Sequence, residues 1–145
     1  MEILPQFTQN DVSVAPFVTE LLRCAIQKQA SDMHVEPYLA GYRIRYRRQG
    51  MLMPADSFPF AFGLRVLARL KVLAELDIAE RRLPQDGRFT FDTDQPMDCR
   101  VSTCPTRHGE KMVVRFFRQS ACALTLDALF LEPNQADQIW RALTQ

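Results

Sequence analysis

Two arginines in the second half of the sequence, Arg100 and Arg115, have the residue type and spacing for phosphate chemistry. Arg115 interrupts the apolar run 112–117, and a guanidinium among buried side chains is costly unless it has an anionic partner. If the preceding loop centres on positions 107–108, antiparallel pairing sets Arg100 directly opposite Arg115, where like charges destabilise a sheet unless an acid or a phosphate lies between them. This pair of forked donors therefore predicts a phosphate clamp.

Acidic residues in the sequence allow other interpretations. Asp98, Glu110 or another carboxylate could pair with each arginine and give it a structural role. Asp32, His34 and Glu36 alternate, so on a strand their side chains share one face. That row could hold a metal, move protons, contact a partner, or form only a polar strand edge in which hydrogen bonds hold His34. No HExxH or paired-cysteine spacing supports a metal centre.

The densest positive cluster is the stripe Arg43–Arg48. On an exposed sheet face this stripe could follow a nucleic-acid backbone, with Tyr42 and Tyr46 available for stacking on bases. Strand alternation, however, places the tyrosines on the face opposite the arginines. A solvated or partner-facing sheet surface is therefore favoured over nucleic-acid binding.

Length and composition are those of one soluble globular domain. The chain has 145 residues, 47% of them hydrophobic and 24% charged, and a formal net charge of +1. No apolar run approaches the ~18 residues that cross a bilayer, and the amino terminus lacks a signal-peptide pattern. We expect a cytoplasmic location, and reduced, mostly buried cysteines, with a Cys99–Cys104 disulfide or a zinc site as the alternatives.

Hydrophobic periodicity predicts helices at both ends of the chain and strands between them, after a lead-in over residues 1–15. The predicted helices are 16–29, 60–75 and 133–143. The predicted strands are 31–37, 42–48, 88–91, 97–103 and 111–117. The connections are a turn at Gln49-Gly50, a polar loop over 77–87 and turns over 94–96 and 105–109. This order predicts an α+β fold, an antiparallel sheet with helices packed mainly on one face.

Two of these helices carry specific expectations. In the middle helix an apolar stripe that includes Val66 and Leu70 leaves Lys71 off the buried side. In the last helix Trp140 belongs to a stripe at helical spacing and is expected to anchor the helix on the domain.

A phosphate-binding loop is absent from the sequence. There is no GxxxxGK[ST] motif, and the five glycines are dispersed. The chain is therefore not expected to bind a nucleoside triphosphate by itself in the P-loop manner.

Five segments together resemble one protein family. They are ASDMHVEP at 30–37, YRIRYR at 42–47, the run 68–88 ending in RRLPQDGR, RVST at 100–103 and PTRHGEK at 105–111. In order and spacing they resemble the hexameric ATPases of type II secretion and type IV pilus assembly, within the type II/IV secretion ATPase superfamily. The resemblance runs from about Pro16 to the end and is to the PAS-like amino-terminal module that precedes the ATPase core.

The resemblance implies a PAS-like domain over 16–145 that senses nucleotide and contacts other subunits of a bacterial protein-transport motor. By the same resemblance, Arg100 and Arg115 contact the nucleotide phosphates in the assembled enzyme. The chain stops at Gln145, where the family continues to its Walker A loop, so we expect no ATP hydrolysis by this chain alone. ATP and Mg are implied as cofactors of the full-length family only.

The partners that the resemblance implies are the ATPase core of the same or a neighbouring subunit and, indirectly, the inner-membrane platform. A cytoplasmic domain held at the membrane through partners is expected, without nucleic acid and without membrane insertion. Two alternatives belong to other classes: an autonomous PAS-like ligand-binding or sensor domain with an apolar pocket, and a nucleic-acid-binding module that uses Arg43–Arg48.

Overall fold

The structure is a computed structural model that describes residues 13–93, 96–118 and 133–143. Its helices are α1 (Val14–Gln27), α2 (Phe60–Leu73) and α4 (Pro133–Leu143). Its strands are β1 (Asp32–Tyr38), β2 (Gly41–Arg48), β3 (Met51–Phe58), β4 (Gln85–Phe91), β5 (Met97–Thr106) and β6 (Gly109–Arg118).

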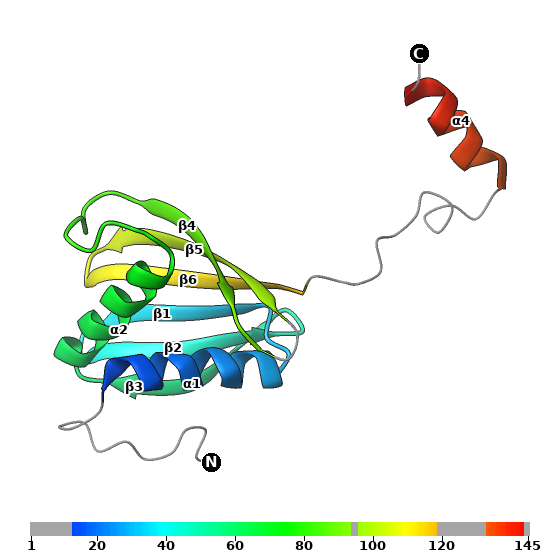
Figure 1. Ribbon diagram of the computed structural model, residues 1–145. Coiled ribbons are helices and arrows are strands. Elements are labelled where there is room, and N and C mark those ends of the chain that lie inside the picture. The colour runs from blue at the N-terminus through cyan, green and yellow to red at the C-terminus, as the bar shows by residue number, and fades with distance from the viewer. Residues whose placement is uncertain (1–12, 94–95, 119–132, 144–145) are drawn as a thin grey trace.

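The six strands form one antiparallel sheet in the order β3-β2-β1-β6-β5-β4. Helices α1 and α2 cover one face of this sheet, and no helix among the described residues packs on the opposite face, which we call the open face (Figure 1). The arrangement confirms the predicted α+β class, with an antiparallel sheet and helices on one face. It also means that alternate residues of each strand face either the helices or the open side.

The core lies between the two helices and the sheet. Leu21 and Leu22 of α1 and Val66 and Leu70 of α2 are fully buried there, as their helical spacing predicts. On β2, Tyr42, Ile44 and Tyr46 face this core while the arginines between them lie on the open side. The predicted separation of tyrosines from arginines is confirmed.

Strand β3 was missed by sequence reasoning. Its segment Met51–Phe58 contains Pro54 and has no clean alternation of apolar and polar residues. The structure accommodates the proline because β3 is an edge strand and its pairing with β2 changes register between Ile44 and Arg45, where Pro54 lies. Edge strands and irregularities are the places where a sheet tolerates a residue without an N–H.

The second half of the sheet is longer than predicted. Strand β4 begins at Gln85, inside the predicted loop 77–87. Strand β5 ends only at Thr106, and β6 already begins at Gly109. The turn between β5 and β6 therefore centres on positions 107–108, as the clamp prediction assumed.

The side chain of Lys71 lies inside the molecule, and its predicted position off the buried side of the helix is wrong. It is only 1% exposed, and its Nζ atom lies 2.8 Å from Glu110 Oε1. The same ammonium donates hydrogen bonds to the carbonyl oxygens of Asp77 and Glu80. The loop after α2 thus closes over this end of the helix, which the helical pattern alone does not indicate.

The expectation for the last helix is confirmed only in part. Helix α4 covers Pro133–Leu143 as predicted, but Trp140 is 56% exposed and does not serve as a buried anchor. Most of the lead-in (1–12), Asp94-Gln95 of the predicted turn and Cys122 lie outside the described residues. Within the described part, Cys24, Cys99 and Cys104 are thiols, the first two buried.

Replacing Gly63 by alanine is expected to lower the free energy of unfolding by about 1–3 kcal/mol. A Cβ atom at Gly63 would overlap the Tyr42 ring. That ring cannot move easily because it is fully buried and its hydroxyl donates to Glu110 O at 3.1 Å. Urea unfolding followed by circular dichroism measures the effect. Ala61→Gly, an exposed change in the same helix, reports helix propensity alone, and a stabilised Gly63→Ala chain would contradict the packing argument.

Candidate functional site

A row of charged side chains crosses the open face of the sheet. Pairing between strands sets Arg47 opposite Asp32, Asp32 opposite Arg115, Arg115 opposite Arg100, and Arg100 opposite Arg88. Residues directly opposite each other on neighbouring strands point to the same side. Four arginines and one aspartate therefore form one row across β2, β1, β6, β5 and β4, and we call it the arginine row.

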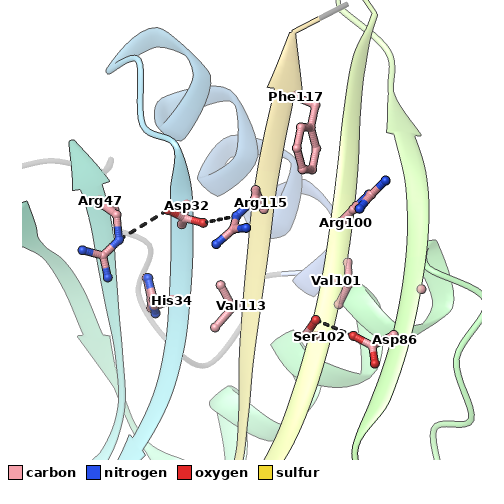
Figure 2. A pocket seen from close by; sticks show the side chains of 11 residues that line it. Asp32, His34, Arg47, Asp86, Arg100, Val101, Ser102, Val113, Arg115 and Phe117 are labelled. Carbon is pink, nitrogen blue, oxygen red and sulfur yellow. Dashed lines mark hydrogen bonds and ion pairs between the residues drawn. The ribbon is translucent and has the colours of Figure 1, made fainter. Parts of the chain in front are cut away.

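The arginine row forms one part of a groove on this face. The groove has a volume of about 600 Å³ and is lined by Asp32, Arg47, Arg100 and Arg115 of the row and, beside them, by His34, Asp86 and Phe117 among others (Figure 2). The groove lies on the open face, on which none of the described helices packs.

Asp32 is the acid at the centre of the row. Its Oδ1 atom accepts a hydrogen bond from Arg115 Nε at 2.8 Å, and its Oδ2 lies 3.4 Å from Arg47 Nε. Ser31 Oγ also donates to Oδ2 at 2.8 Å. Burial by itself would raise the pKa of Asp32, but the hydrogen bonds from Arg115 and Ser31 outweigh burial and hold it below its ordinary value. Asp32 is therefore ionised at neutral pH.

Arg115 is exposed, and the prediction that it lies among buried side chains is wrong. Val113, Arg115 and Phe117 face the open side, whereas Met112 and Val114 face the core. The side chain of Arg115 is 62% exposed. Its Nε donates to Asp32. Arg115 is therefore paired with a carboxylate, as the structural alternative to the clamp expected, but the partner is neither Asp98 nor Glu110.

Arg100 lies directly opposite Arg115 in the register, as predicted. Its guanidinium carbon is 5.1 Å from the centre of the Phe117 ring, a cation–π distance. In Figure 2 the guanidinium of Arg100 extends away from Arg115, and that of Arg115 extends toward Asp32. Within the described residues Arg100 has no carboxylate within ion-pair distance.

His34 shares the open face with Asp32 and Glu36, as the alternation predicts. Its side chain is 9% exposed, and Nδ1 is 3.8 Å from Glu36 Oε1, which is too far for a hydrogen bond. Among the described residues neither ring nitrogen has a hydrogen-bond partner. Burial lowers the pKa of His34, with the charge of Lys111 acting in the same direction, so the ring is neutral at neutral pH.

Glu36 organises a second charged cluster farther along β1. Arg45 donates to both of its oxygens at 2.8 and 2.9 Å, Arg43 donates at 3.2 Å, and Lys111 Nζ is 3.0 Å away. Burial opposes ionisation, but the hydrogen bonds from Arg45 and Lys111 lower the pKa of Glu36 to about 2. Two arginines of the Arg43–Arg48 stripe are thus neutralised by a carboxylate on the next strand.

The sequence did not indicate that Asp32 and Arg88 would join Arg100 and Arg115 in one row. Asp32 was considered only with its neighbours on the same strand, because its pairing with β6 joins residues 83 positions apart. Arg88 joins the row only through the β4–β5 register. The alternation of Arg88 with Phe89 and Phe91 was the one available signal. It indicates the face of the sheet on which Arg88 lies, but not which residue lies opposite it on the next strand.

Over residues 8–145 the chain matches the family described as type II/IV secretion system protein. The chain belongs to that family. Within the type II/IV secretion system proteins, it is 43% identical over 138 residues to the type IV pilus assembly ATPase PilB of Pseudomonas aeruginosa, which covers 94% of this chain and 24% of the relative. It is also 41% identical over 137 residues to type II secretion system protein E of Xanthomonas campestris. That alignment covers 94% of this chain and 24% of the relative.

Solved structures of the same architecture also match. The ATPase DotB of Legionella pneumophila aligns with a TM-score of 0.62 and 14% identity, covering 94% of this chain and 37% of that one. The pilus retraction motor PilT aligns with a TM-score of 0.53 and 17% identity. That alignment covers 81% of this chain and 33% of the PilT chain. These likenesses support the fold. The chain spans about a quarter of the length of the curated relatives named above.

No helix among the described residues is both long enough and apolar enough to cross a membrane. The family resemblance inferred from the five motifs is confirmed by these matches, and it includes both pilus assembly and type II secretion proteins.

Proposed function

We propose that this chain is the nucleotide-sensing and subunit-contact domain of a bacterial type II secretion or type IV pilus assembly ATPase. In this role Arg100 and Arg115 bind the nucleotide phosphates when an ATPase core of the same or a neighbouring subunit closes on the open face. The chain alone is expected not to hydrolyse ATP, and ATP with Mg enters only with the core. A cytoplasmic location, with attachment to an inner-membrane platform through partners, belongs to the same proposal.

The observation that carries the proposal is the position of two exposed arginines, opposite each other in the strand register, in a groove on the face of the sheet that α1 and α2 do not cover. The groove has a surplus of one positive charge, because three arginines line it, Arg47, Arg100 and Arg115, together with two aspartates, Asp32 and Asp86. Arg115 holds Asp32 through Nε and extends toward it, so it reaches a phosphate shared with Arg100 only after it turns away from this carboxylate. A single phosphate between the two arginines requires their flexible side chains to turn toward each other.

The nucleic-acid alternative has less support. Arg43 and Arg45 point toward Glu36, and Arg47 is shared between Asp32 and the carbonyl oxygen of Gly50. An arginine stripe that is largely paired with carboxylates offers few charges to a phosphate backbone.

Replacing Arg100 or Arg115 by alanine is expected to lower ATP hydrolysis about tenfold or more for each arginine. The reason is that a charge-assisted hydrogen bond contributes about 1.5–3 kcal/mol and 1.4 kcal/mol corresponds to a factor of ten. The measurement is the hydrolysis rate of a matching ATPase core to which this chain is added in trans.

Arg23→Ala is the matched control, because Arg23 lies on α1 and pairs only with its neighbour Glu20 among the described residues. Circular dichroism establishes that each variant is folded. If the double variant with alanine at both positions stimulates the core as well as the unmodified chain does, the phosphate role of these arginines is wrong.

A further inference from the structure

The ion pair between Asp32 and Arg115 joins one buried and one exposed partner. The Asp32 side chain is 6% exposed, whereas that of Arg115 is 62% exposed. Asp32 is held from two further sides, by Ser31 Oγ at 2.8 Å and by Arg47 Nε at 3.4 Å. The arginine can therefore leave the pair by rotating in solvent, and the carboxylate stays in place.

The departure of Arg115 does not leave a buried charge without a partner. Asp32 keeps Arg47 and Ser31, so the penalty for an unpaired buried carboxylate is avoided. An exchange in which Arg115 trades its carboxylate for an external anion is thus possible within the fold as it stands.

A second, independent feature of the groove also indicates an external ligand. His34 lines the groove next to Asp32 on β1, its side chain is 9% exposed, and within the described chain both ring nitrogens lack hydrogen-bond partners (Figure 2). Buried polar atoms in folded proteins nearly always have a partner. A neutral imidazole beside a cationic row provides one N–H donor for an anion that enters the groove.

We propose that Asp32 is an internal competitor for Arg115, which a ligand must displace with at least one phosphate group, so that the groove binds polyphosphates and discriminates against single small anions. Arg100 and Arg88 make the first contacts, because neither has a carboxylate partner among the described residues. The competition for Arg115 follows. This inference rests on the proposed function, because it assigns a regulatory step to the same phosphate site.

The spacing of the arginines explains why tripolyphosphate is expected to bind more tightly than inorganic phosphate. Neighbouring strands are about 4.8 Å apart, so the arginines on β6, β5 and β4 span roughly 10 Å. A triphosphate can contact more than one of them while it competes with Asp32. A single inorganic phosphate has to meet the competition with fewer contacts.

The test is calorimetric titration of this chain with inorganic tripolyphosphate and with inorganic phosphate at low salt. Asp32→Asn is expected to tighten tripolyphosphate binding about tenfold, the factor for one charge-assisted hydrogen bond released from competition. It is also expected to narrow the difference between tripolyphosphate and phosphate. Asp86→Asn is the matched control, since Asp86 lines the same groove but bonds to Ser102 and not to an arginine. A gain below about threefold is expected there, from charge removal alone.

A spectroscopic measurement on the unmodified chain keeps the test independent of the stability of Asp32→Asn. The Nε–H resonance of Arg115 reports its hydrogen bond to Asp32, and saturating tripolyphosphate is expected to move this resonance to its position in Asp32→Asn saturated with the same ligand. An unchanged resonance at saturation would overturn the exchange. So would an Asp32→Asn chain that binds tripolyphosphate no more tightly than Asp86→Asn, or less tightly than the unmodified chain.

The outcomes separate this inference from the proposed function. If Arg100→Ala and Arg115→Ala weaken tripolyphosphate binding but Asp32→Asn does not strengthen it, the phosphate site stands and the competition by Asp32 is wrong. If neither the unmodified chain nor Asp32→Asn binds tripolyphosphate, both are overturned.

Discussion

Replacing Lys71 by methionine is expected to lower the free energy of unfolding by about 3–5 kcal/mol, because the change leaves Glu110 buried without its cation. Lys71 is 1% exposed and the side chain of Glu110 is 3% exposed, with Nζ and Oε1 2.8 Å apart. Methionine fills most of the same volume, so the cost comes from charge and hydrogen bonding and much less from a cavity. Urea unfolding followed by circular dichroism measures it.

The double variant Lys71→Met/Glu110→Gln is the control for the unpaired charge. Like the single variant, it lacks the Lys71 hydrogen bonds to the Asp77 and Glu80 carbonyl oxygens, but it has no buried carboxylate at position 110. About half of the lost stability is expected to return. Equal stability of the single and double variants would show that the carboxylate is not the cause.

The same variant has a local effect that connects the buried pair to the groove. Lys71 and Gln85 both hold the loop that leads into β4, through the carbonyl oxygens of Asp77 and Glu80. Strand β4 carries Asp86 at one side of the groove and Arg88 of the arginine row. Tryptic cleavage after the exposed Arg81 and Arg82 is therefore expected to accelerate in Lys71→Met.

Glu36→Gln is expected to cost about 2–4 kcal/mol of stability at pH 7, because three cationic side chains then surround a neutral amide. The pH dependence follows from the pKa of Glu36, which is about 2 in the folded chain against an ordinary value of 4.5. A carboxyl group whose pKa is lowered by folding contributes stability that is fully present above its ordinary pKa. This contribution is lost as the pH falls from 4.5 toward 2.

The measurement is the difference in urea unfolding free energy between the unmodified chain and Glu36→Gln at pH 7 and at pH 3. Taking the difference removes the titration of other acids, Asp32 among them, and the gap is expected to shrink at the lower pH. Glu20→Gln is the control, since Glu20 forms a surface pair with Arg23 and its loss is expected to cost less than about 1 kcal/mol. A pH-independent gap for Glu36 would contradict the assignment of its lowered pKa to these cations.

Patterns that depend on near neighbours in the sequence were predictable. The spacing of Leu21 and Leu70 with their neighbours located α1 and α2, and the alternation around Ile44 located β2 and its two faces. The opposition of Arg100 and Arg115 followed from the length of one hairpin. Each of these inferences needs only a period or a turn, so distant parts of the chain do not affect it.

The features that escaped prediction depend on distant parts of the chain. Arg115 is exposed because the described helices pack on the other face of the sheet, and the apolar residues around Arg115 in the sequence do not indicate this. Lys71 is buried because Glu110, far along the chain, meets it beneath a closing loop. The arginine row needs the registers of several strand pairs at once, and a slip of one residue in any pair would remove a member.

The central position of β1 and β6 has a consequence for how the protein is made. As the ribosome releases the chain, β1, β2 and β3 can pair as soon as they emerge, yet one side of β1 stays without a neighbour until β6 has been synthesised. An open strand edge of this kind favours association with other chains. We therefore expect a transcript truncated before β6 to yield aggregation-prone product, and a newborn chain to form the arginine row only after β6 has left the ribosome.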